Sequence, residues 1–159
     1  MNALNTQNTS SQSGFTLLEI LLVLGILALL AGVGAGYYYG SFKELQLAAA
    51  VRDLGADLRF TQDQAMTGES GLRFGLHAVA GPPSYYEEFS TATNYADPGM
   101  AVVKTVYLPD GLNFSDPVPG GTKDIVFGRL SGTTTATALT ITGANSSKTV
   151  NISALGKVE

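Results

Sequence analysis

Residues 13–39 read SGFTLLEILLVLGILALLAGVGAGYYY, and this stretch decides the architecture of the chain. From Phe15 onward it is apolar for about 25 residues, which is long enough to cross a lipid bilayer as a helix. Its one charged residue is Glu19. A carboxylate inside a membrane-spanning helix costs about 2.5 to 3.5 kcal/mol even on lenient insertion scales. Glu19 therefore needs a role that compensates for this cost. The three tyrosines at 37–39 end the stretch, where an aromatic belt would meet lipid headgroups.

Beyond the tyrosines, apolar side chains continue at spacings of three, four or seven, which is typical of one face of a helix. They are Leu47, Val51, Leu54, Leu58 and Ala65. The charged residues between positions 43 and 63 fall mostly on other faces, and Gly68 is a suitable C-terminal stop. The sequence therefore predicts one helix over residues 15–67, apolar all round in its first half and amphipathic in its second. A helix buried in a core is disfavoured, because helices that are apolar all round are rare in such small domains.

Three glycines interrupt the helical pattern within five residues, at Gly32, Gly34 and Gly36. Each costs about 1 kcal/mol of helix propensity relative to alanine. Two interpretations remain open. Glycine is common in transmembrane helices, and the cluster is equally consistent with a segment that can melt or stretch.

From residue 70 onward the pattern changes to short β-like runs separated by turn signals. The runs predicted as strands are 71–79, 84–89, 100–108, 123–130, 138–142 and 148–155. Most connections are too short for helical crossovers, so the sheet should be antiparallel. The predicted fold class is α+β, with a long N-terminal helix packed on a C-terminal antiparallel β-sheet domain. The expected divisions are 1–14 as a polar leader, 15–39 as the apolar half of the helix, 40–68 as the amphipathic half and 69–159 as the β domain.

Composition excludes several classes of function. The chain of 159 residues has no cysteine, which excludes disulfides, thiolate metal sites and cysteine nucleophiles. Its net charge is −4 and its nine basic residues are scattered, so a nucleic-acid surface is not expected.

The sequence also contains no recognisable catalytic pattern. His77 is the single histidine and lies in a predicted strand, where a packed or surface role is expected. Glu87 and Glu88 are adjacent in a predicted strand, so they point to opposite faces, and both are interpreted as solvated. Turn chemistry accounts for the loop aspartates as well as calcium binding does. They are Asp97, Asp110, Asp116 and Asp124. The sequence therefore predicts no enzyme, no cofactor and no metal site.

The stretch GFTLLEILLVLGILALLAG, residues 14–32, resembles the class III signal of type IV pilins and type II secretion pseudopilins. The resemblance implies that a membrane prepilin peptidase cuts after Gly14 and methylates the new N-terminal Phe15. Glu19 then takes the place of the family's glutamate, the fifth residue of the mature subunit. The leader departs from the family pattern because it carries no Lys or Arg before Gly14. A second departure from the family pattern is Gly36, because many major pilins have a proline at this position.

This resemblance gives Glu19 a physical role. Cleavage would create a charged amine at Phe15, and apolar helices bundled in a filament core have a low effective dielectric constant. A carboxylate and an ammonium ion buried separately are costly, whereas a pair offsets much of that cost. We therefore expect Glu19 of one subunit to pair with the Phe15 amine of a neighbour. Such a pair would fix the axial register, as a polar residue does in a coiled coil. The alternative is that Glu19 merely reaches the membrane surface.

The C-terminal residues 124–159, DIVFGRLSGTTTATALTITGANSSKTVNISALGKVE, resemble the end of the GspH/FimT class of minor pseudopilins and pilins. Some members of this class bind DNA through a basic Gly-Arg-x-Arg ending. Here the ending is Gly156-Lys157-Val158-Glu159, where an acid replaces the second cation. The resemblance thus favours a structural subunit of a secretion pseudopilus or type IV pilus-like filament, most like a minor subunit at or near the tip.

The alternatives kept open are a major pilin of a filament shaft and a DNA-binding minor pilin for competence. An ordinary secreted domain beginning at Gly36 is disfavoured by the missing basic region, by Glu19 and by the continuing helix. The expected partners are other pilin or pseudopilin subunits, the prepilin peptidase, an inner-membrane assembly platform and, before assembly, membrane lipid. Nucleic acid is not among them. The expected location is the cytoplasmic membrane, crossed once with the C-terminal domain outside the cytoplasm, and then a periplasmic or extracellular filament.

Overall fold

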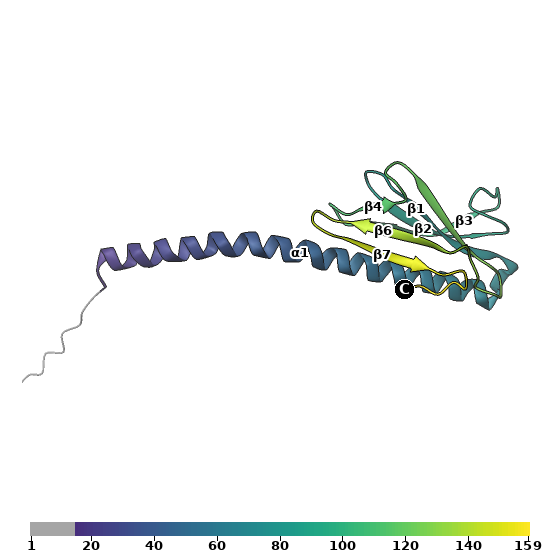
Figure 1. Ribbon diagram of the computed structural model, residues 1–159, viewed down its shortest axis with the longest axis horizontal. Coiled ribbons are helices and arrows are strands. Elements are labelled where there is room, and N and C mark those ends of the chain that lie inside the picture. Colours follow the sequence, from purple (N-terminus) through teal and green to yellow (C-terminus); the bar gives the residue numbers. More distant parts are fainter. Residues whose placement is uncertain (1–14) are drawn as a thin grey trace, which may run out of the picture. The chain divides into compact units, whose positions relative to one another are not determined.

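The computed structural model describes residues 15–159, and for residues 33–41 and 69 it describes the backbone alone. The expected leader, 1–14, lies outside the described residues. The chain divides into two compact units, Met1–Tyr39 and Gly40–Glu159. Helix α1, Leu17–Thr67, runs through the division (Figure 1). The prediction of one long helix over 15–67 is therefore confirmed to within two residues.

Helix α1 ends where the sequence predicted. Gly68 has a φ of 65°, a left-handed conformation that glycine adopts without a steric penalty, and a short 3₁₀ turn, η1 (Glu69–Gly71), follows. The backbone N–H of Leu130 donates to the carbonyl of Ala65 over 2.9 Å, which satisfies one of the last carbonyls of the helix. The end of α1 is thus held by the connection that follows strand β5 (Thr122–Phe127).

Seven strands follow the helix and form two antiparallel sheets (Figure 1). The first sheet has the order β3-β2-β1-β5, in which β1 is Arg73–Val79, β2 is Tyr85–Thr91, β3 is Ala101–Tyr107 and β5 is Thr122–Phe127. The second has the order β4-β6-β7, with β4 at Asn113–Asp116, β6 at Thr137–Thr142 and β7 at Ser147–Ile152. The expected α+β class is confirmed, and so is the antiparallel pairing.

Two details differ from the sequence-based expectation. Strand β4 was not predicted, because Asn113 and Asp116 belong to residue types that are depleted in strands. Its backbone pairs with β6, and that partner lies far away along the chain. The strands were also expected to form one sheet, whereas a second sheet begins with β4.

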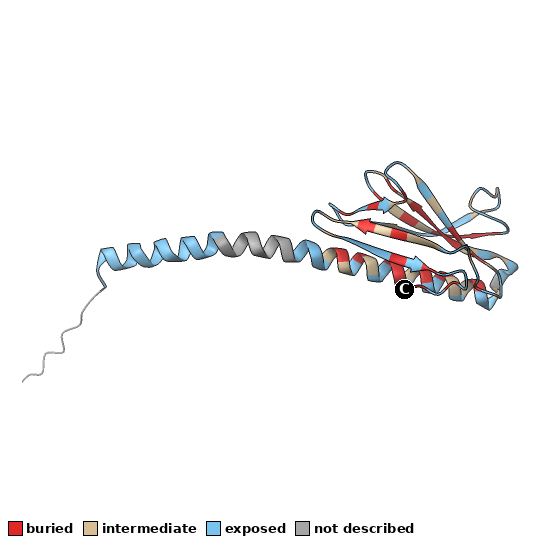
Figure 2. Ribbon diagram, viewed as in Figure 1, coloured by how far each residue is buried: buried red, intermediate tan, exposed pale blue. Residues whose placement is uncertain are grey.

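One hydrophobic core joins the second half of α1 to both sheets. Leu47, Leu54, Leu58 and Ala65 are fully buried, as the helical spacing predicted, and Val51 is partly buried. They pack with Phe127 of the first sheet, with Ile141 of the second and with other buried residues of the same cluster. Figure 2 shows the buried residues of this part of α1 in red on the side of the strands. The amphipathic half of the helix is therefore the base on which the β domain is built.

Candidate functional site

The first turn of α1 carries the acidic residue that the sequence singled out. Thr16 precedes the helix, and its Oγ1 accepts a hydrogen bond from the backbone N–H of Glu19 over 3.2 Å. This is one half of the capping box Thr-x-x-Glu, in which the N-cap side chain satisfies an otherwise unpaired N–H. Glu19 also lies at the positive end of the helix macrodipole, where a carboxylate is favoured. Gly14, expected as the last residue of the leader, lies outside the described residues.

The turns that follow Glu19 leave their apolar side chains uncovered. Phe15 is 79 % exposed, and the large apolar residues from Leu17 to Leu30 are between 46 % and 83 % exposed. Figure 2 shows this part of the helix in pale blue throughout. An uncovered apolar surface of this extent is typical of a place where a protein meets another protein or a lipid phase. Among the residues that the structure describes, no helix combines the length and the apolarity that a membrane span requires.

The glycine cluster lies within the helix. The backbone of α1 is continuous through Gly32, Gly34 and Gly36. A Cβ atom added at Gly32 would meet nothing within 4 Å, so Gly32 is not needed for close packing within this chain. The proposed flexibility of the segment stays a prediction.

In the β domain, Asp57 of α1 is joined to the first sheet by two side chains. Tyr86 on β2 donates from its hydroxyl to Asp57 Oδ2 over 2.7 Å, and Lys104 on β3 donates from Nζ to the same oxygen, also over 2.7 Å. Burial raises the pKa of Tyr86, and its hydrogen bond to Asp57 raises it further, so the hydroxyl remains a donor. The bridge formed by Asp57, Tyr86 and Lys104 fixes the helix to two neighbouring strands.

Glu88 lies beside this bridge, and the prediction that it is solvated is wrong. Its side chain is 3 % exposed, because its position opposite Leu76 turns it toward the core face of the sheet. Burial raises the pKa of Glu88, and the negative charge of Asp57 adds to this effect. Lys104 opposes the shift with its Nζ at 3.3 Å from Oε1, although that oxygen has no well-aligned hydrogen bond among the described residues. One lysine therefore serves two carboxylates.

The opposite face of the first sheet carries the single histidine. His77 on β1 shares a hydrogen bond through Nδ1 with Asp124 on β5, its direct cross-strand neighbour. The ring of Tyr95 stacks on the imidazole, with 3.7 Å between centroids and 4° between planes. Tyr95 also donates to Glu87 Oε2 over 2.7 Å, and burial followed by this hydrogen bond raises the pKa of Tyr95 to about 12. These contacts hold His77 in a packed arrangement that fastens the β2–β3 connection over the sheet.

The loop aspartates are engaged in local structure. Asp97 accepts from the backbone N–H of Gly99 and from the hydroxyl of Thr93, each over 2.9 Å, and the Gly99 bond is the main reason that its pKa is lowered. Asp116 pairs with Lys123. Within residues 15–159, no three acidic or histidine side chains that the structure describes lie close enough together to hold a metal ion.

The C-terminus folds back onto the domain. Val158 is buried and forms an isolated bridge with Ile152, and Arg59 of α1 donates to its carbonyl over 3.1 Å. Lys157 pairs with Glu159, and this pairing lowers the pKa of Glu159. The cation of the C-terminal motif is thus neutralised by the acid two residues later.

The roles of Thr16 and of the bridge at Asp57 were not predicted from the sequence. The Thr16 cap had a recognisable signal, since Thr-x-x-Glu before an apolar run is the pattern of a capping box. The bridge at Asp57 had none, because its three members come from elements that are far apart in the sequence.

Comparisons with known proteins agree with the fold and with both sequence motifs. Residues 50–156 match the family described as type II transport protein GspH, and residues 9–35 match the prokaryotic N-terminal methylation motif. Among solved structures, the minor pseudopilin EpsH from the type 2 secretion system of Vibrio cholerae is similar. Its TM-score is 0.53 and its sequence identity is 16 %, over 72 % of this chain and 94 % of that chain. At this identity the likeness shows the fold alone. The comparison with curated protein sequences gives no match.

Proposed function

The chain belongs to the GspH family of type II transport proteins, and from this premise we propose that it is a minor pseudopilin, a structural subunit of a secretion pseudopilus. One observation carries the proposal. The exposed apolar start of α1, with Glu19 in its first turn, lies inside a methylation-motif match, and the same helix continues into the GspH-matched region. The structural neighbour, described as a minor pseudopilin, supports the choice of a minor subunit.

In this proposal the prepilin peptidase cuts after Gly14 and methylates Phe15. The match to the N-terminal methylation motif over residues 9–35 supports this step, because it contains both residues. The apolar half of α1 would first be held in the cytoplasmic membrane by lipid, with the β domain outside the cytoplasm. An inner-membrane assembly platform would then transfer it into a filament, where other subunits cover the same side chains.

The exposed side chains need an apolar cover at every stage, from lipid before this transfer and from other subunits after it. Full burial of one leucine, isoleucine or phenylalanine contributes roughly 1.5 to 3 kcal/mol. Side chains such as Leu17 and Leu29 are more than 70 % exposed in the chain alone, so most of this free energy is gained only when lipid or a partner covers them. The hydrophobic contribution has no preferred register, however, because one leucine-rich surface resembles another.

Glu19 would supply the register. In a bundle of apolar helices its carboxylate is stabilised by an ammonium ion and destabilised without one. The amine of a processed Phe15 is the cation that every neighbouring subunit would present at a fixed distance from its own Glu19. Pairing between subunits therefore selects one axial offset among many that bury the same apolar area.

The proposed role is structural, with no catalysis and no cofactor. The paired Lys157 and Glu159 argue against the alternative of a DNA-binding competence subunit, since that role needs unpaired cations. No described feature favours a major subunit of a filament shaft.

The intact mass and the N-terminal sequence of the chain recovered from cell membranes test the proposal. A start at Phe15, with the mass of one added methyl group, is expected. A start at Gly36 would instead indicate a soluble exported domain, and an uncut Met1 would indicate a plain anchored protein. Either of these results would contradict processing as a pseudopilin.

A further inference from the structure

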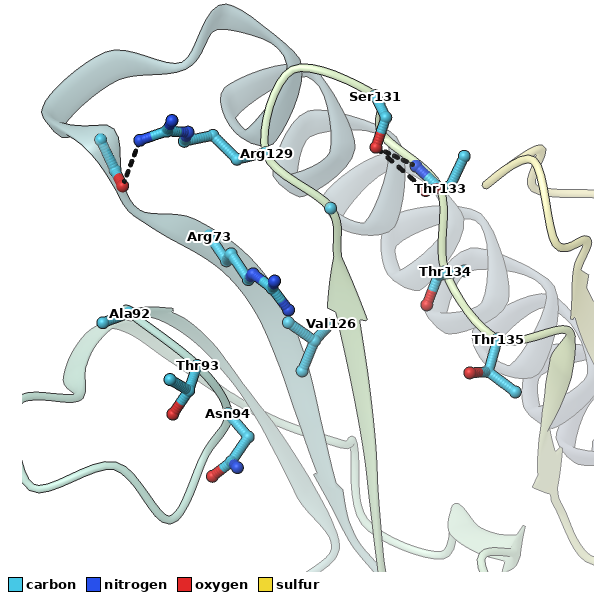
Figure 3. A pocket seen from close by; sticks show the side chains of 12 residues that line it. Arg73, Ala92, Thr93, Asn94, Val126, Arg129, Ser131, Thr133, Thr134 and Thr135 are labelled. Carbon is cyan, nitrogen blue, oxygen red and sulfur yellow. Dashed lines mark hydrogen bonds between the residues drawn. The ribbon is translucent and has the colours of Figure 1, made fainter.

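A polar hollow of about 820 Å³ lies where β1 begins and β5 ends, on the β domain (Figure 3). Arg73 is the first residue of β1, and Arg129 follows the end of β5. Hydroxyl and amide side chains make up much of the remaining wall, and they come from the β2–β3 and β5–β6 connections: Thr93, Asn94, Ser131, Thr133, Thr134 and Thr135. All of its described lining residues lie between Gly71 and Thr135 in the sequence.

The two arginines give the hollow a positive charge. No acidic residue belongs to its described lining. The side chain of Arg73 is exposed and has no hydrogen-bond or ion-pair partner among the described residues, and in Figure 3 it extends toward Val126. Arg129 donates from Nη1 to the carbonyl of Gly71 over 3.1 Å. A guanidinium group has five N–H donors, so Arg129 keeps donors for a ligand while this bond holds it in place.

One wall of the hollow is the β5–β6 connection, and backbone hydrogen bonds hold this connection in place. The N–H of Gly128 donates to the carbonyl of Thr133 over 2.7 Å, and the N–H of Gly132 donates to the carbonyl of Gly128 over 2.8 Å. A Cβ atom at Gly132 would lie 2.7 Å from Met66 Cγ, so this connection rests directly on the last turns of α1. The backbone that carries the hydroxyl groups is therefore held in place before a ligand arrives, which favours binding.

We propose that this hollow binds the carboxylates of an acidic segment on a partner protein. The planar guanidinium fork matches a carboxylate with two parallel hydrogen bonds. The side-chain hydroxyls of Thr134 and Thr135 line the hollow and have no partner among the described residues, so they can donate to the remaining oxygens. The inference goes beyond the role of α1 in a filament, since no residue of the hollow belongs to the apolar helix.

Charge favours an acidic peptide over a nucleic acid. Phosphate backbones are bound by tracks of several cations, whereas only two line this hollow. The chain as a whole has a net charge of −4 and should repel an acidic peptide at long range. Binding of such a peptide would therefore depend on the local positive charge of this hollow.

Titration of the full chain in neutral detergent micelles with a short polyglutamate peptide tests the proposal. We expect saturable binding at low ionic strength, and a loss of at least about tenfold in affinity for Arg73→Gln. Arg52→Gln is the matched control, because Arg52 is an exposed arginine of α1 with no partner among the described residues. The control should bind as the wild type does. Thermal unfolding by circular dichroism verifies that each variant is folded.

Arg73→Lys provides a second test that keeps the charge. It should bind more weakly than the wild type, because an ammonium group cannot form the two parallel bonds. Wild-type affinity in Arg73→Lys would contradict bidentate recognition. Absence of peptide binding, or equal losses in Arg73→Gln and Arg52→Gln, would overturn the site. Binding of a DNA oligonucleotide through Arg73 in place of the peptide would overturn the assignment to a protein partner.

Discussion

The hydroxyl of Tyr86 on β2 lies 2.7 Å from Oδ2 of Asp57 on α1, so a hydrogen bond between two side chains ties the helix to the first sheet. Tyr86 is 1 % exposed, and its ring belongs to the core cluster. The same residue therefore contributes both apolar packing and a polar link. Removal of the Tyr86 hydroxyl oxygen alone should therefore weaken the attachment of α1 to the first sheet.

Tyr86→Phe removes the hydroxyl and leaves the ring. We expect the free energy of unfolding to fall by roughly 1 to 2 kcal/mol, because a buried hydrogen bond to a carboxylate is lost while Lys104 still neutralises Asp57. Urea unfolding of the full chain in detergent, followed by circular dichroism, measures the change. Tyr107→Phe is the control. Because Tyr107 is 62 % exposed, this variant should keep nearly the whole free energy of unfolding. Equal losses in the two variants would contradict a specific role for the bond.

Glu88→Gln tests the buried carboxylate through pH. Burial raises the pKa of Glu88 in the folded chain above its ordinary value of 4.5. A raised folded pKa means that the contribution of Glu88 to stability is complete below the unfolded pKa. That contribution is lost as the pH rises through the folded pKa. The glutamine cannot titrate, so the variant should lose less stability than the wild type on the alkaline side of 4.5.

The measurement for Glu88 is the free energy of unfolding at several pH values, from about pH 4, near the ordinary pKa of glutamate, to about pH 8, well above it. Glu44→Gln serves as a control, because Glu44 is an exposed acid on α1. Parallel curves for Glu88→Gln and the wild type would show that Glu88 does not hold its proton more tightly in the folded chain.

Glu19→Ala should leave cleavage after Gly14 intact and impair filament assembly. The expected loss follows from the missing partner for the Phe15 amine in the bundle. Immunoblotting for the processed chain measures cleavage, and the amount of subunit in isolated filaments measures assembly. Glu44→Ala removes an exposed acid from the same helix and should assemble normally. Normal filaments from Glu19→Ala would end the register hypothesis.

Glu19→Gln separates the two roles of this residue. Glutamine can complete a capping box as glutamate does, but it carries no charge. If the ion pair governs assembly, Glu19→Gln should fail as Glu19→Ala does. Assembly of the glutamine variant at the wild-type level would assign Glu19 to the helix start instead.

Gly75→Ala should destabilise the first sheet. A Cβ atom at Gly75 would lie 2.6 Å from both the carbonyl oxygen of Ile125 and the ring of Phe89. Such overpacking costs about 1 to 3 kcal/mol. Gly55→Ala is the contrasting variant, because its Cβ would meet only Arg59 Nη1 at 3.6 Å within the helix. It should gain about 0.5 to 1 kcal/mol of stability from the smaller backbone entropy of alanine. Thermal unfolding of both variants gives the comparison.

Local patterns predicted the helical part of this fold well. The spacing of Leu47, Leu54 and Leu58 depends only on the helical period, and all three are fully buried. Six of the seven strands were also expected, because β-branched or aromatic residues occur in each of them and turn signals separate them. The grouping into two sheets could not be predicted, since it depends on pairings between distant segments such as β4 and β6.

Some functional residues could likewise be recognised from the sequence, whereas others could be recognised only from strand pairing. Glu19 is conspicuous in the sequence because its charge contradicts its apolar surroundings. Glu88 looks like any acid in a strand, and only the pairing with Leu76 reveals that it faces the core. Arg73 and Arg129 are separated by more than fifty residues, and the pairing of β1 with β5 brings their strands together.

The cap at Thr16 has a consequence for the moment of processing. Thr16 is the second residue of a chain that begins at Phe15, so cutting after Gly14 would not disturb the start of α1. The new ammonium group would then sit one residue before the N-cap, at the positive end of the helix macrodipole, where a cation is disfavoured. Peptide-bond cleavage would thus convert a neutral leader junction into an electrostatically unsatisfied end. The peptidase that removes the leader would thus, in the same step, create the positive charge that the carboxylate of a neighbouring subunit compensates.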